Sequence, residues 1–600
     1  MTFLKKDSAG RFCRLLMWAM ILCLAALCAS DAFAARKRRP PKKKIASKKG
    51  VVSKAAFQAR VRRAVKRQCV RPGRLGLYIR SVSTAQTLYS HNAARKRIPA
   101  SNVKLFTAAA ALAHLGPDYR FATDFYVKDK VRGGVLRGDL YLKGYGDPLF
   151  VHEKMRDFVR RLKLRGVRRI EGDLVADDTF FDEKKHGRGW RVGRSIRPYL
   201  APHGALSLNF GLANVLVAPG DRVGGPARAN LEPSSRALRL WAKVKTSRGK
   251  HPKIWLGRRR SKGKDLVQVG GSFPVRSRMR TYRVPVTDPT AFTAGAVAAE
   301  FERQGIALKG RIRRAVTPPD AKLLARNLSP PLGEVVSGLN KFSNNFVAEQ
   351  VLKTMGAEAH GAPGTAEKGL RVVRDFLLST GVLAKEIALA DGSGLSRMNR
   401  ASPRALAVLL EAAHNDFRLR PEFMASLAVF GVDGTVKKRR RRGVDSRRVR
   451  VKTGVLNGVR AFSGYAAARN GEIIAFSILM NGNACRPKSL TGEVVRAMVA
   501  LNRNFSNPVN AHLRGAREIM ARPMPKPSIR DGWRRRSSPR PDPAEEDDFE
   551  ELGPGIVPIA ESPLDDSPDD SPAEKSAEAA PVEGSGAWSS KSGPGGRSRE

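Results

Sequence analysis

The chain has 600 residues and a formal net charge of +57 at pH 7, from 111 Lys and Arg against 54 Asp and Glu. This length exceeds what one hydrophobic core accommodates, so we expect at least two domains besides any tails. So strong a positive charge suggests an anionic partner, either nucleic acid or an anionic surface. The nine histidines lack His-Glu-x-x-His spacing and no cysteine cluster suits zinc, so we expect no metal and no cofactor.

The first 34 residues have the pattern of a cleavable signal peptide. Basic residues precede an apolar run over 15–27, and Ala32-Phe33-Ala34 offers small residues at the two positions that a signal peptidase reads. The run is too short to span a membrane comfortably, which favours cleavage over an uncleaved anchor. Export predicts a periplasmic protein with no nucleic-acid partner, whose positive charge faces the anionic cell envelope. A basic surface that is only solvated remains the alternative.

The segment after the signal peptide begins with a tether and continues into folded elements. Residues 35–52 are rich in Lys, Arg and Pro, have nothing to bury, and are predicted to be a disordered tether that contacts anionic envelope material. Ser53 is a candidate N-cap for a helix over 54–67. Two strands are predicted over 75–81 and 86–90.

The next helix carries the first candidate for chemistry. Ser101 and Lys104 are three residues apart at its start, so they share a face, and an apolar run follows that can bury them. A hydroxyl beside an amine that burial can neutralise is an activated nucleophile. The same Ser-x-x-Lys spacing at 247–250 and 261–264 lies in polar stretches, which we interpret as surface loops.

Residues 119–285 differ in pattern from the rest of the chain. Short half-buried strands with Gly turns are predicted over 135–144, 170–178 and 214–220, and no long amphipathic helix is expected. We interpret this part as a β-rich insertion. Helical patterning returns over 289–304.

Two more motifs follow in the second half. Ser343-Asn344-Asn345 stands at the turn into a predicted helix, and Lys452-Thr453-Gly454 is the one Lys-Thr-Gly in the chain. Alone, each has a plain structural interpretation, a helix cap for the first and a common tripeptide for the second. Their order after Ser101, each in a suitable local structure, favours function.

The end of the folded part is predicted to be a meander and a helix. Strands are expected over 448–453, 459–467 and 473–480, with a two-residue hairpin turn at Asn470-Gly471. A helix over 491–501 follows. From residue 520 to 600 the chain is rich in Pro, Ser, Gly and acids and is predicted to be disordered.

The three motifs resemble one enzyme group. Ser-x-x-Lys, Ser-Asp-Asn and Lys-Thr-Gly mark penicillin-binding proteins and class A β-lactamases, and Asn344 here replaces the middle aspartate. From about residue 54 to 501 the chain resembles the D-alanyl-D-alanine carboxypeptidase/endopeptidase family, the class C low-molecular-mass penicillin-binding proteins. Five further blocks resemble that family: 144–148, 174–178, 205–209, 391–397 and 431–435.

The resemblance implies a fold and an activity. The fold is α/β (α+β), a transpeptidase-like domain over 53–118 and 286–505 with a five-stranded antiparallel sheet and flanking helices, carrying the β-rich insertion over 119–285. The activity is that of a serine D-Ala-D-Ala carboxypeptidase/endopeptidase that acts on peptidoglycan through an acyl-enzyme and is inhibited by β-lactams. A β-lactamase or esterase with the same site, and a weakly catalytic wall-binding scaffold, are the alternatives.

The resemblance also implies the roles of five catalytic residues. Ser101 attacks the carbonyl of the penultimate D-alanine and Lys104 takes its proton. Ser343 relays that proton to the leaving amine, and Asn345 holds a backbone amide of the substrate. Lys452 binds the terminal carboxylate.

Further residues are implied to bind substrate. Thr453 joins Lys452 at the carboxylate, Gly454 lets the substrate lie along the strand edge, and the N–H of Val455 completes an oxyanion hole with that of Ser101. By the same resemblance Asp147 and Arg397 lie near the side chain of the stem peptide's diamino acid. A turn or a surface ion pair is the alternative for these two.

The family's sheet bears on two cysteines and a basic run. Cys69 precedes the first strand and Cys485 follows the last; these strands are antiparallel neighbours in that sheet, so a disulfide between them is a hypothesis. The run 437–442 is more basic than the family pattern. It could guide anionic substrate, although a solvated loop is the simpler interpretation.

Overall fold

A computed structural model describes residues 52–67, 72–193, 195–439, 445–482 and 487–503. The predicted signal peptide (1–34), the tether (35–52) apart from its last residue, the tail (520–600), and both Cys69 and Cys485 lie outside the described residues, so these predictions stay open. Within the described ranges, no helix combines the length and the apolar character needed to cross a bilayer.

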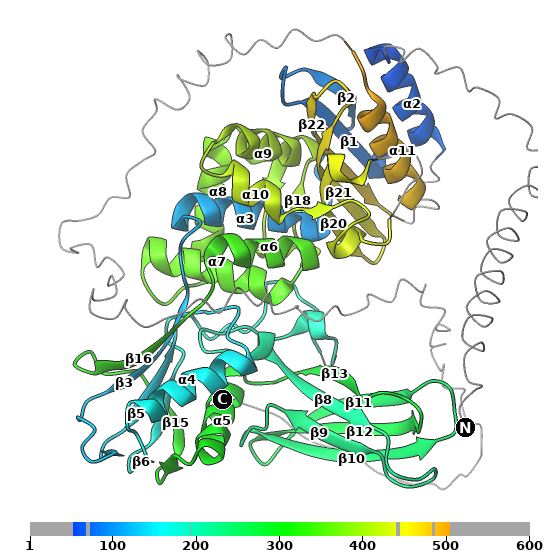
Figure 1. The fold of residues 1–600 in the computed structure, drawn as a ribbon. Helices are drawn as coiled ribbons and strands as arrows, with labels where there is room; N and C mark the ends of the chain where they lie inside the picture. Colours follow the sequence, from blue (N-terminus) through cyan, green and yellow to red (C-terminus); the bar gives the residue numbers. More distant parts are fainter. Residues whose placement is uncertain (1–51, 68–71, 194, 440–444, 483–486, 504–600) are drawn as a thin grey trace, which may run out of the picture. The chain divides into compact units, whose positions relative to one another are not determined.

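One antiparallel sheet joins the two ends of the folded chain (Figure 1). Its strands, in spatial order, are β19 (Ala428–Val429), β20 (Val449–Leu456), β21 (Val459–Ala467), β22 (Ile473–Asn481), β1 (Leu75–Ser81) and β2 (Thr87–His91). Every neighbouring pair is antiparallel. The predicted sheet of five antiparallel strands is therefore confirmed, and the two-residue strand β19 extends it beyond β20.

The central strand β22 separates two hydrophobic cores. Strand side chains alternate between faces, and here both faces are buried. Ile474, Phe476 and Ile478 pack with α2 (Lys54–Lys66) and α11 (Pro487–Ala500). Ala475 and Leu479 belong to the core on the opposite face of the sheet, which the larger layer of helices covers.

That helical layer holds the helix predicted to follow Ser101. It consists of α3 (Val103–Leu115), α6 (Leu332–Phe342), α7 (Asn345–His360), α8 (Ala366–Ser379), α9 (Pro403–Asn415) and α10 (Arg420–Ser426). Helix α3 is buried from Val103 to Leu112, because it lies between the sheet and the other helices. Its first turn is a 3₁₀ turn, η2 (Ala100–Asn102), which carries Ser101.

The inserted region begins with a mixed sheet of order β15-β7-β5-β3-β16. These strands are β3 (Ala122–Val127), β5 (Leu140–Gly144), β7 (Leu174–Asp177), β15 (Ile312–Arg314) and β16 (Lys322–Leu328), and a small parallel sheet of β4 (Val135–Leu136), β6 (Arg169–Ile170) and β14 (Ala307–Leu308) lies beside it. Helix α5 (Pro289–Gln304) packs in the same core. The insertion was expected to end at residue 285, but these contacts extend its sheet to residue 328.

The expectation of no long amphipathic helix in the insertion was wrong. Helix α4 (His152–Leu164) buries Met155, Phe158, Val159 and Leu162, at helical spacing, against α5 and the mixed sheet. Basic residues between these positions face solvent and hide the apolar stripe in the sequence.

Two three-stranded sheets enclose a second core of the insertion. One has the order β13-β8-β9, with β8 (Leu212–Ala218), β9 (Arg228–Glu232) and β13 (Arg280–Pro285). The other has the order β10-β12-β11, with β10 (Leu238–Ser247), β11 (Lys253–Ser261) and β12 (Lys264–Pro274). Valines of both sheets meet between them.

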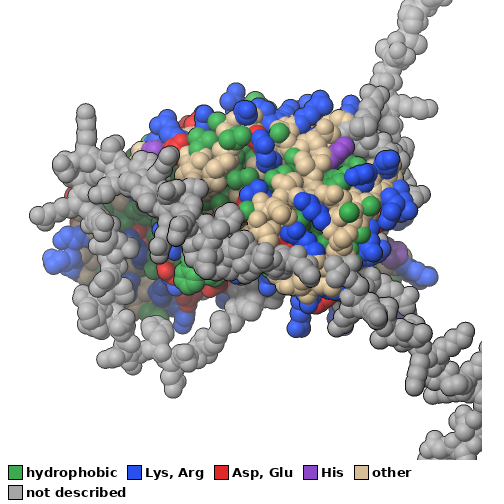
Figure 2. Space-filling view, turned by 90° about the horizontal axis from the view of Figure 1, so that it is seen from above, with side chains coloured by type: hydrophobic (Ala, Val, Ile, Leu, Met, Phe, Trp, Pro, Cys, Tyr) green, Lys and Arg blue, Asp and Glu red, His purple; other side chains and the backbone are tan. Residues whose placement is uncertain are grey.

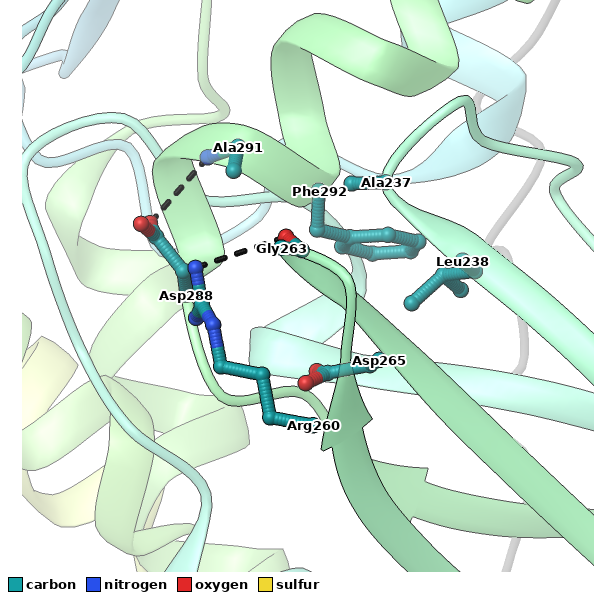
Figure 3. Close-up of a pocket in the computed structure, with 8 residues that line it drawn as sticks. All are labelled: Ala237, Leu238, Arg260, Gly263, Asp265, Asp288, Ala291 and Phe292. Carbon is teal, nitrogen blue, oxygen red and sulfur yellow. Dashed lines mark hydrogen bonds between the residues drawn. The ribbon is translucent and has the colours of Figure 1, made fainter.

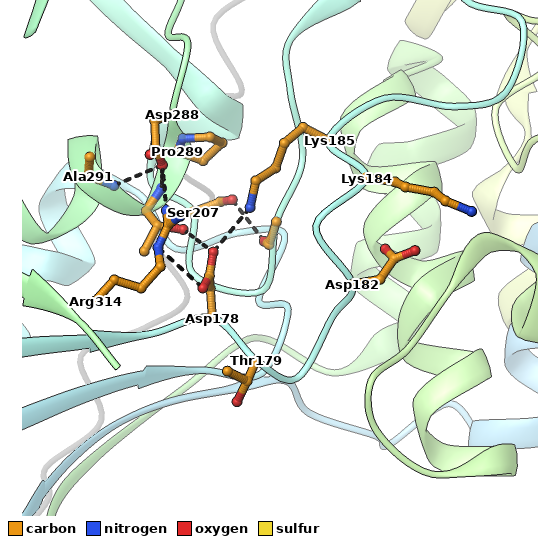
Figure 4. Close-up of polar contacts among 12 residues, drawn as sticks. Asp178, Thr179, Asp182, Lys184, Lys185, Ser207, Asp288, Pro289, Ala291 and Arg314 are labelled. Carbon is orange, nitrogen blue, oxygen red and sulfur yellow. Dashed lines mark hydrogen bonds and ion pairs between the residues drawn. The ribbon is translucent and has the colours of Figure 1, made fainter. Parts of the chain in front are cut away.

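The start of α5 ties these parts together. Asp288 caps the helix by accepting hydrogen bonds from the N–H groups of Thr290 and Ala291 at 3.0 and 3.1 Å. Figure 3 shows a pocket beside this cap, between the β11–β12 turn and Phe292. Asp178 accepts a hydrogen bond of 3.1 Å from Lys185 (Figure 4) and one of 2.6 Å from Thr290, so it fixes the loop after β7 to α5.

Candidate active site

The first candidate residues meet at the turn into α3. Nζ of Lys104 lies 3.2 Å from Oγ of Ser101. Lys104 has no exposed surface, and this burial lowers the pKa of its ammonium to about 7, although the carboxylates of Asp391 and Glu349 act to raise it. Near neutral pH a large share of Lys104 is therefore unprotonated and can accept the hydroxyl proton.

Two segments far along the chain also contact Lys104. Its Nζ donates to Oδ1 of Asn345 at 2.7 Å and to the carbonyl of Ser393 at 2.6 Å. Asn345 begins α7, after Asn344 caps that helix by accepting from the N–H of Val347. Asn345 and Ser393 thus hold the amine of Lys104 in place, with its remaining side directed toward the hydroxyl of Ser101.

A second lysine lies with the second motif. Nζ of Lys452, from the middle of β20, donates to Oγ of Ser343 at 2.7 Å and to the carbonyl of Thr453 at 2.8 Å. Lys452 is fully buried, and burial followed by repulsion from Lys104 holds its pKa well below the usual lysine range. The two amines therefore lie within electrostatic range, and an anion between them would be stabilised.

The third motif approaches the Ser101 turn closely. A Cβ at Gly454 would stand 3.0 Å from the N of Ser101 and from the carbonyl oxygen of Pro99, so only glycine fits here without displacement. On the other side, a Cβ at Gly394 would stand 1.9 Å from the carbonyl oxygen of Ala100. Ala100 itself has a φ of 47°, a conformation that such close packing holds in place.

The hydroxyl of Thr453 has a partner that the sequence did not indicate. It lies 2.7 Å from the hydroxyl of Thr435, in the turn η6 (Gly434–Val436) next to β19. Val455, two residues further along β20, leaves 55% of its surface exposed.

Two buried acids support Lys104 and were not predicted as site residues. Glu349, one helical turn after Asn345, accepts from the N–H groups of Gly392 and Ser393 at 3.2 and 2.9 Å. Burial and the nearby Asp391 raise the pKa of Glu349 to about 8. The i, i+4 spacing of Glu349 from Asn345 is the signal that could have identified it.

Loops of the insertion complete this support. Nε1 of Trp190 donates to Asp391 at 2.8 Å, and Nδ2 of Asn345 donates to the carbonyl of Tyr199 at 3.0 Å. Neither contact could be foreseen from the sequence, because both depend on how the insertion packs against the loop of Asp391 and the start of α7.

The two proposed side-chain-binding residues have different surroundings. Asp147 is buried; its Oδ1 accepts from the N–H of Leu149, while its Oδ2 has no partner among the described residues. Burial raises the pKa of Asp147 to about 6. Arg397 is exposed and donates to the carbonyl of Asn457, in the turn after β20.

In sum, Ser101, Lys104 and Asn345 form one hydrogen-bonded group, and Ser343 and Lys452 form another beside it. Among the residues that the structure describes, no hydrogen bond or ion pair links Asp147 to either group. The pocket of Figure 3 shares none of these residues.

Comparisons with known proteins agree on one family. The model of the D-Ala-D-Ala carboxypeptidase 3 (S13) family matches residues 58–505. The chain is 34% identical over 425 residues to the D-alanyl-D-alanine carboxypeptidase of Actinomadura sp. (strain R39), which covers 68% of this chain and 78% of the relative. It is 26% identical over 439 residues to the D-alanyl-D-alanine carboxypeptidase DacB of Haemophilus influenzae, which covers 72% of this chain and 90% of that protein.

Solved structures give the same fold. The crystal structure of penicillin binding protein 4 (dacB) from Haemophilus influenzae aligns with a TM-score of 0.62 at 24% identity, over 73% of this chain and 97% of that one. The same protein complexed with a β-lactam aligns with a TM-score of 0.59 at 23% identity, over 74% of this chain and 99% of that one.

Proposed function

Because the chain belongs to the D-Ala-D-Ala carboxypeptidase 3 (S13) family, we propose that it hydrolyses the terminal D-Ala-D-Ala bond of peptidoglycan stem peptides with Ser101 as nucleophile. The observation that carries this role is the 3.2 Å contact between Ser101 Oγ and the buried Lys104 Nζ. An amine with a pKa of about 7 is matched to proton transfer at neutral pH.

Acylation begins when Oγ of Ser101 attacks the carbonyl carbon of the penultimate D-alanine and its proton moves to Nζ of Lys104. The resulting oxyanion lies between the N–H groups of Ser101 and Val455, and such donors stabilise the transition state by about 3 kcal/mol each. The close approach of Gly454 to the N of Ser101 supports this pairing of donors.

Release of the leaving group needs a proton on the nitrogen of the terminal D-alanine. Ser343 supplies it and receives in its place the proton that Lys104 took from Ser101, so Lys104 is neutral again, while Lys452 orients the Ser343 hydroxyl by donating to it. Water then attacks the ester of Ser101, and Lys104 takes the proton of that water. The free stem-peptide carboxylate and the original hydroxyl result.

Substrate binding uses the remaining motif residues. The terminal carboxylate pairs with Lys452 and the hydroxyl of Thr453, which Thr435 orients. The peptide lies along the edge of β20, and Asn345 donates to or accepts from its backbone. Asp147 and Arg397 take the amine and the carboxylate of the diamino-acid side chain.

The same site accounts for two further activities. In a peptide crosslink, the carbonyl of the bond to be cleaved also belongs to a D-alanine. An endopeptidase reaction therefore follows the same steps with a different leaving amine. Penicillins acylate Ser101, as the β-lactam complex of the Haemophilus influenzae protein suggests by analogy. A long-lived penicilloyl ester distinguishes this function from that of a β-lactamase.

We place the protein in the periplasm, at anionic envelope surfaces. Lys and Arg greatly outnumber Asp and Glu in the sequence, and basic side chains are spread over the face seen in Figure 2. This distribution favours attraction to polymers that carry carboxylates or phosphates.

The test is mass spectrometry of purified cell-wall fragments incubated with wild type and with Ser101→Ala. We expect wild type to remove 71 Da, one alanine residue, from pentapeptide fragments, and Ser101→Ala to leave them intact. Ser247→Ala, at another Ser-x-x-Lys sequence, is the matched control and should retain full activity. Release of D-alanine by Ser101→Ala, or a wild type that leaves all fragments unchanged, would contradict the proposal.

A further inference from the structure

The outward face of the sheet β10-β12-β11 carries aromatic and basic side chains together. Alternate residues of these strands, including Val244, Val267 and Val269, are buried in the core of the insertion, so their neighbours face solvent. We name this outward side the tryptophan face. Its aromatic and basic members are Arg239, Trp241, Lys243, Lys245, Lys253, Trp255, Arg259 and Lys264.

The two tryptophans form one exposed platform. They come from the outer strands, which lie about 9.5 Å apart because two strand spacings separate them. The ring centroids are nevertheless 5.9 Å apart, at an interplanar angle of 37°. Trp241 leaves 41% and Trp255 leaves 49% of its surface exposed. Exposing this much apolar surface to water is unfavourable, and adjoining exposed apolar side chains mark interaction sites.

A glycine in the central strand makes the platform possible. Gly270 pairs with Trp255 across the sheet, and a Cβ there would stand 2.3 Å from Cζ2 of the indole. The ring of Trp255 therefore lies over the backbone of β12 and leans toward Trp241. The platform is built into the sheet, since any side chain at Gly270 would lift the ring away.

The charge on this face has one sign. Six of its residues are Lys or Arg, and none of the six forms an ion pair with another described residue. The only acid in these three strands is Asp265, which points to the opposite side and accepts from the N–H of Thr287 at 2.6 Å. A field of uncompensated cations around an aromatic platform is complementary to an anionic polymer with apolar ring faces.

We propose that the tryptophan face binds the sugar strand of peptidoglycan. The C–H faces of N-acetylated sugar rings stack on Trp241 and Trp255, and the free carboxylates of the attached stem peptides pair with the surrounding cations. This inference rests on the proposed function, because the active site takes stem peptides of that same polymer. Single-stranded nucleic acid could also stack on the tryptophans and pair with the cations. Unlike the sugar strand, however, it does not carry the stem peptides on which the active site acts.

The experiment measures binding of the full chain, in a Ser101→Ala background, to insoluble peptidoglycan sacculi by co-sedimentation. We expect the pair Trp241→Ala/Trp255→Ala to weaken binding by about tenfold or more. Lys243→Glu/Lys245→Glu should weaken it similarly and reduce its dependence on salt. The matched control, Lys130→Glu/Arg137→Glu, makes the same charge change at exposed positions outside this sheet and should bind as the parent does.

Several outcomes would overturn the proposal. These are unchanged sedimentation of the folded tryptophan variant, equal weakening by the control pair, or tighter binding of this face to single-stranded DNA or to phosphatidylglycerol vesicles than to sacculi. With Ser101 intact, the tryptophan variant should hydrolyse a small soluble D-Ala-D-Ala peptide within about twofold of wild type. A wild type that binds sacculi through this face but does not hydrolyse that peptide would refute the proposed activity and leave the binding face standing.

Discussion

The carbonyl of Tyr199, in the insertion, accepts a hydrogen bond of 3.0 Å from Nδ2 of Asn345, at the start of α7. This contact fixes the orientation of the amide, because the other end of Asn345 must then present Oδ1 to Lys104, 2.7 Å away. Trp190 similarly donates to Asp391, whose loop supplies the carbonyl of Ser393 to the same lysine. Folding of the insertion thus determines how the lysine is held beside Ser101.

Trp190→Phe tests this dependence. An aromatic side chain is kept, but the smaller phenyl group has no N–H, so one hydrogen bond to a buried carboxylate is lost, which costs about 1.5–3 kcal/mol and lets the Asp391 loop shift. We expect kcat/KM for D-alanine release to fall by about tenfold or more while the protein stays folded. Trp255→Phe, on the outward face of β11, should leave this constant within about twofold, and an unchanged Trp190→Phe enzyme would contradict the coupling.

Much of the fold could be predicted from the sequence because its signals are local. The apolar runs of β21 and β22, the apolar run after Ser101 and the cap at Asn344 each depend on neighbours in the chain. The family and its carboxypeptidase activity, expected from three motifs, are confirmed by the family match.

The support around Lys104 could be predicted only in part, since the helical spacing from Asn345 points to Glu349 alone. Only the folded chain shows that Glu349 and Asp391 act together on this amine and that Trp190 holds Asp391. For the same reason, the end of the insertion was predicted too early, at residue 285, although β16 of its sheet ends at residue 328. The pattern of β16 shows a strand, but its partner β3 lies almost two hundred residues earlier.

The pH dependence of activity should follow Lys104. Its pKa is lowered to about 7 by burial, and the neutral amine is the form that accepts the proton of Ser101. We therefore expect kcat/KM to fall about tenfold for each pH unit below 7 and to level off above it. The measurement is D-alanine release from a soluble peptide between pH 5 and 8, and a flat profile across that range would refute the role of this amine as base.

Asp391→Asn should move that acidic limb to lower pH. The carboxylate of Asp391 acts to raise the pKa of Lys104, so its removal lets burial lower this pKa further. The maximum rate should also fall, since Asp391 accepts from the N–H groups of Gly394 and Ser396. The midpoint of the limb is therefore the informative quantity. Asp375→Asn, exposed on α8, is the control that should leave it in place.

Asp147→Asn should stabilise the protein at neutral pH. Burial raises the pKa of Asp147 from 3.8 to about 6, so the folded state holds this proton more tightly than the unfolded state. Stability is therefore lost as the pH rises from about 4 to 6, by roughly 3 kcal/mol as an upper bound, and asparagine avoids the loss. Thermal unfolding should give equal melting temperatures near pH 3 and a higher one for Asp147→Asn at pH 7. Because the charge of Asp147 destabilises the fold, we expect this carboxylate to serve in binding. Hydrolysis of peptides with a diamino acid should therefore fall in Asp147→Asn.

Gly394→Ala isolates the close contact that holds the Ser101 turn. Gly394 and Gly381 have similar left-handed conformations, with φ of 81° and 87°, so alanine strains the backbone about equally at both. Only at Gly394 would the new Cβ stand 1.9 Å from the carbonyl of Ala100, whereas the nearest atom at Gly381 is 4.0 Å away. We expect both variants to lose about 1–2 kcal/mol of stability from the strain alone. Labelling by a fluorescent penicillin should be lost in Gly394→Ala and preserved in Gly381→Ala, and equal labelling of the two would show that this contact does not position the nucleophile.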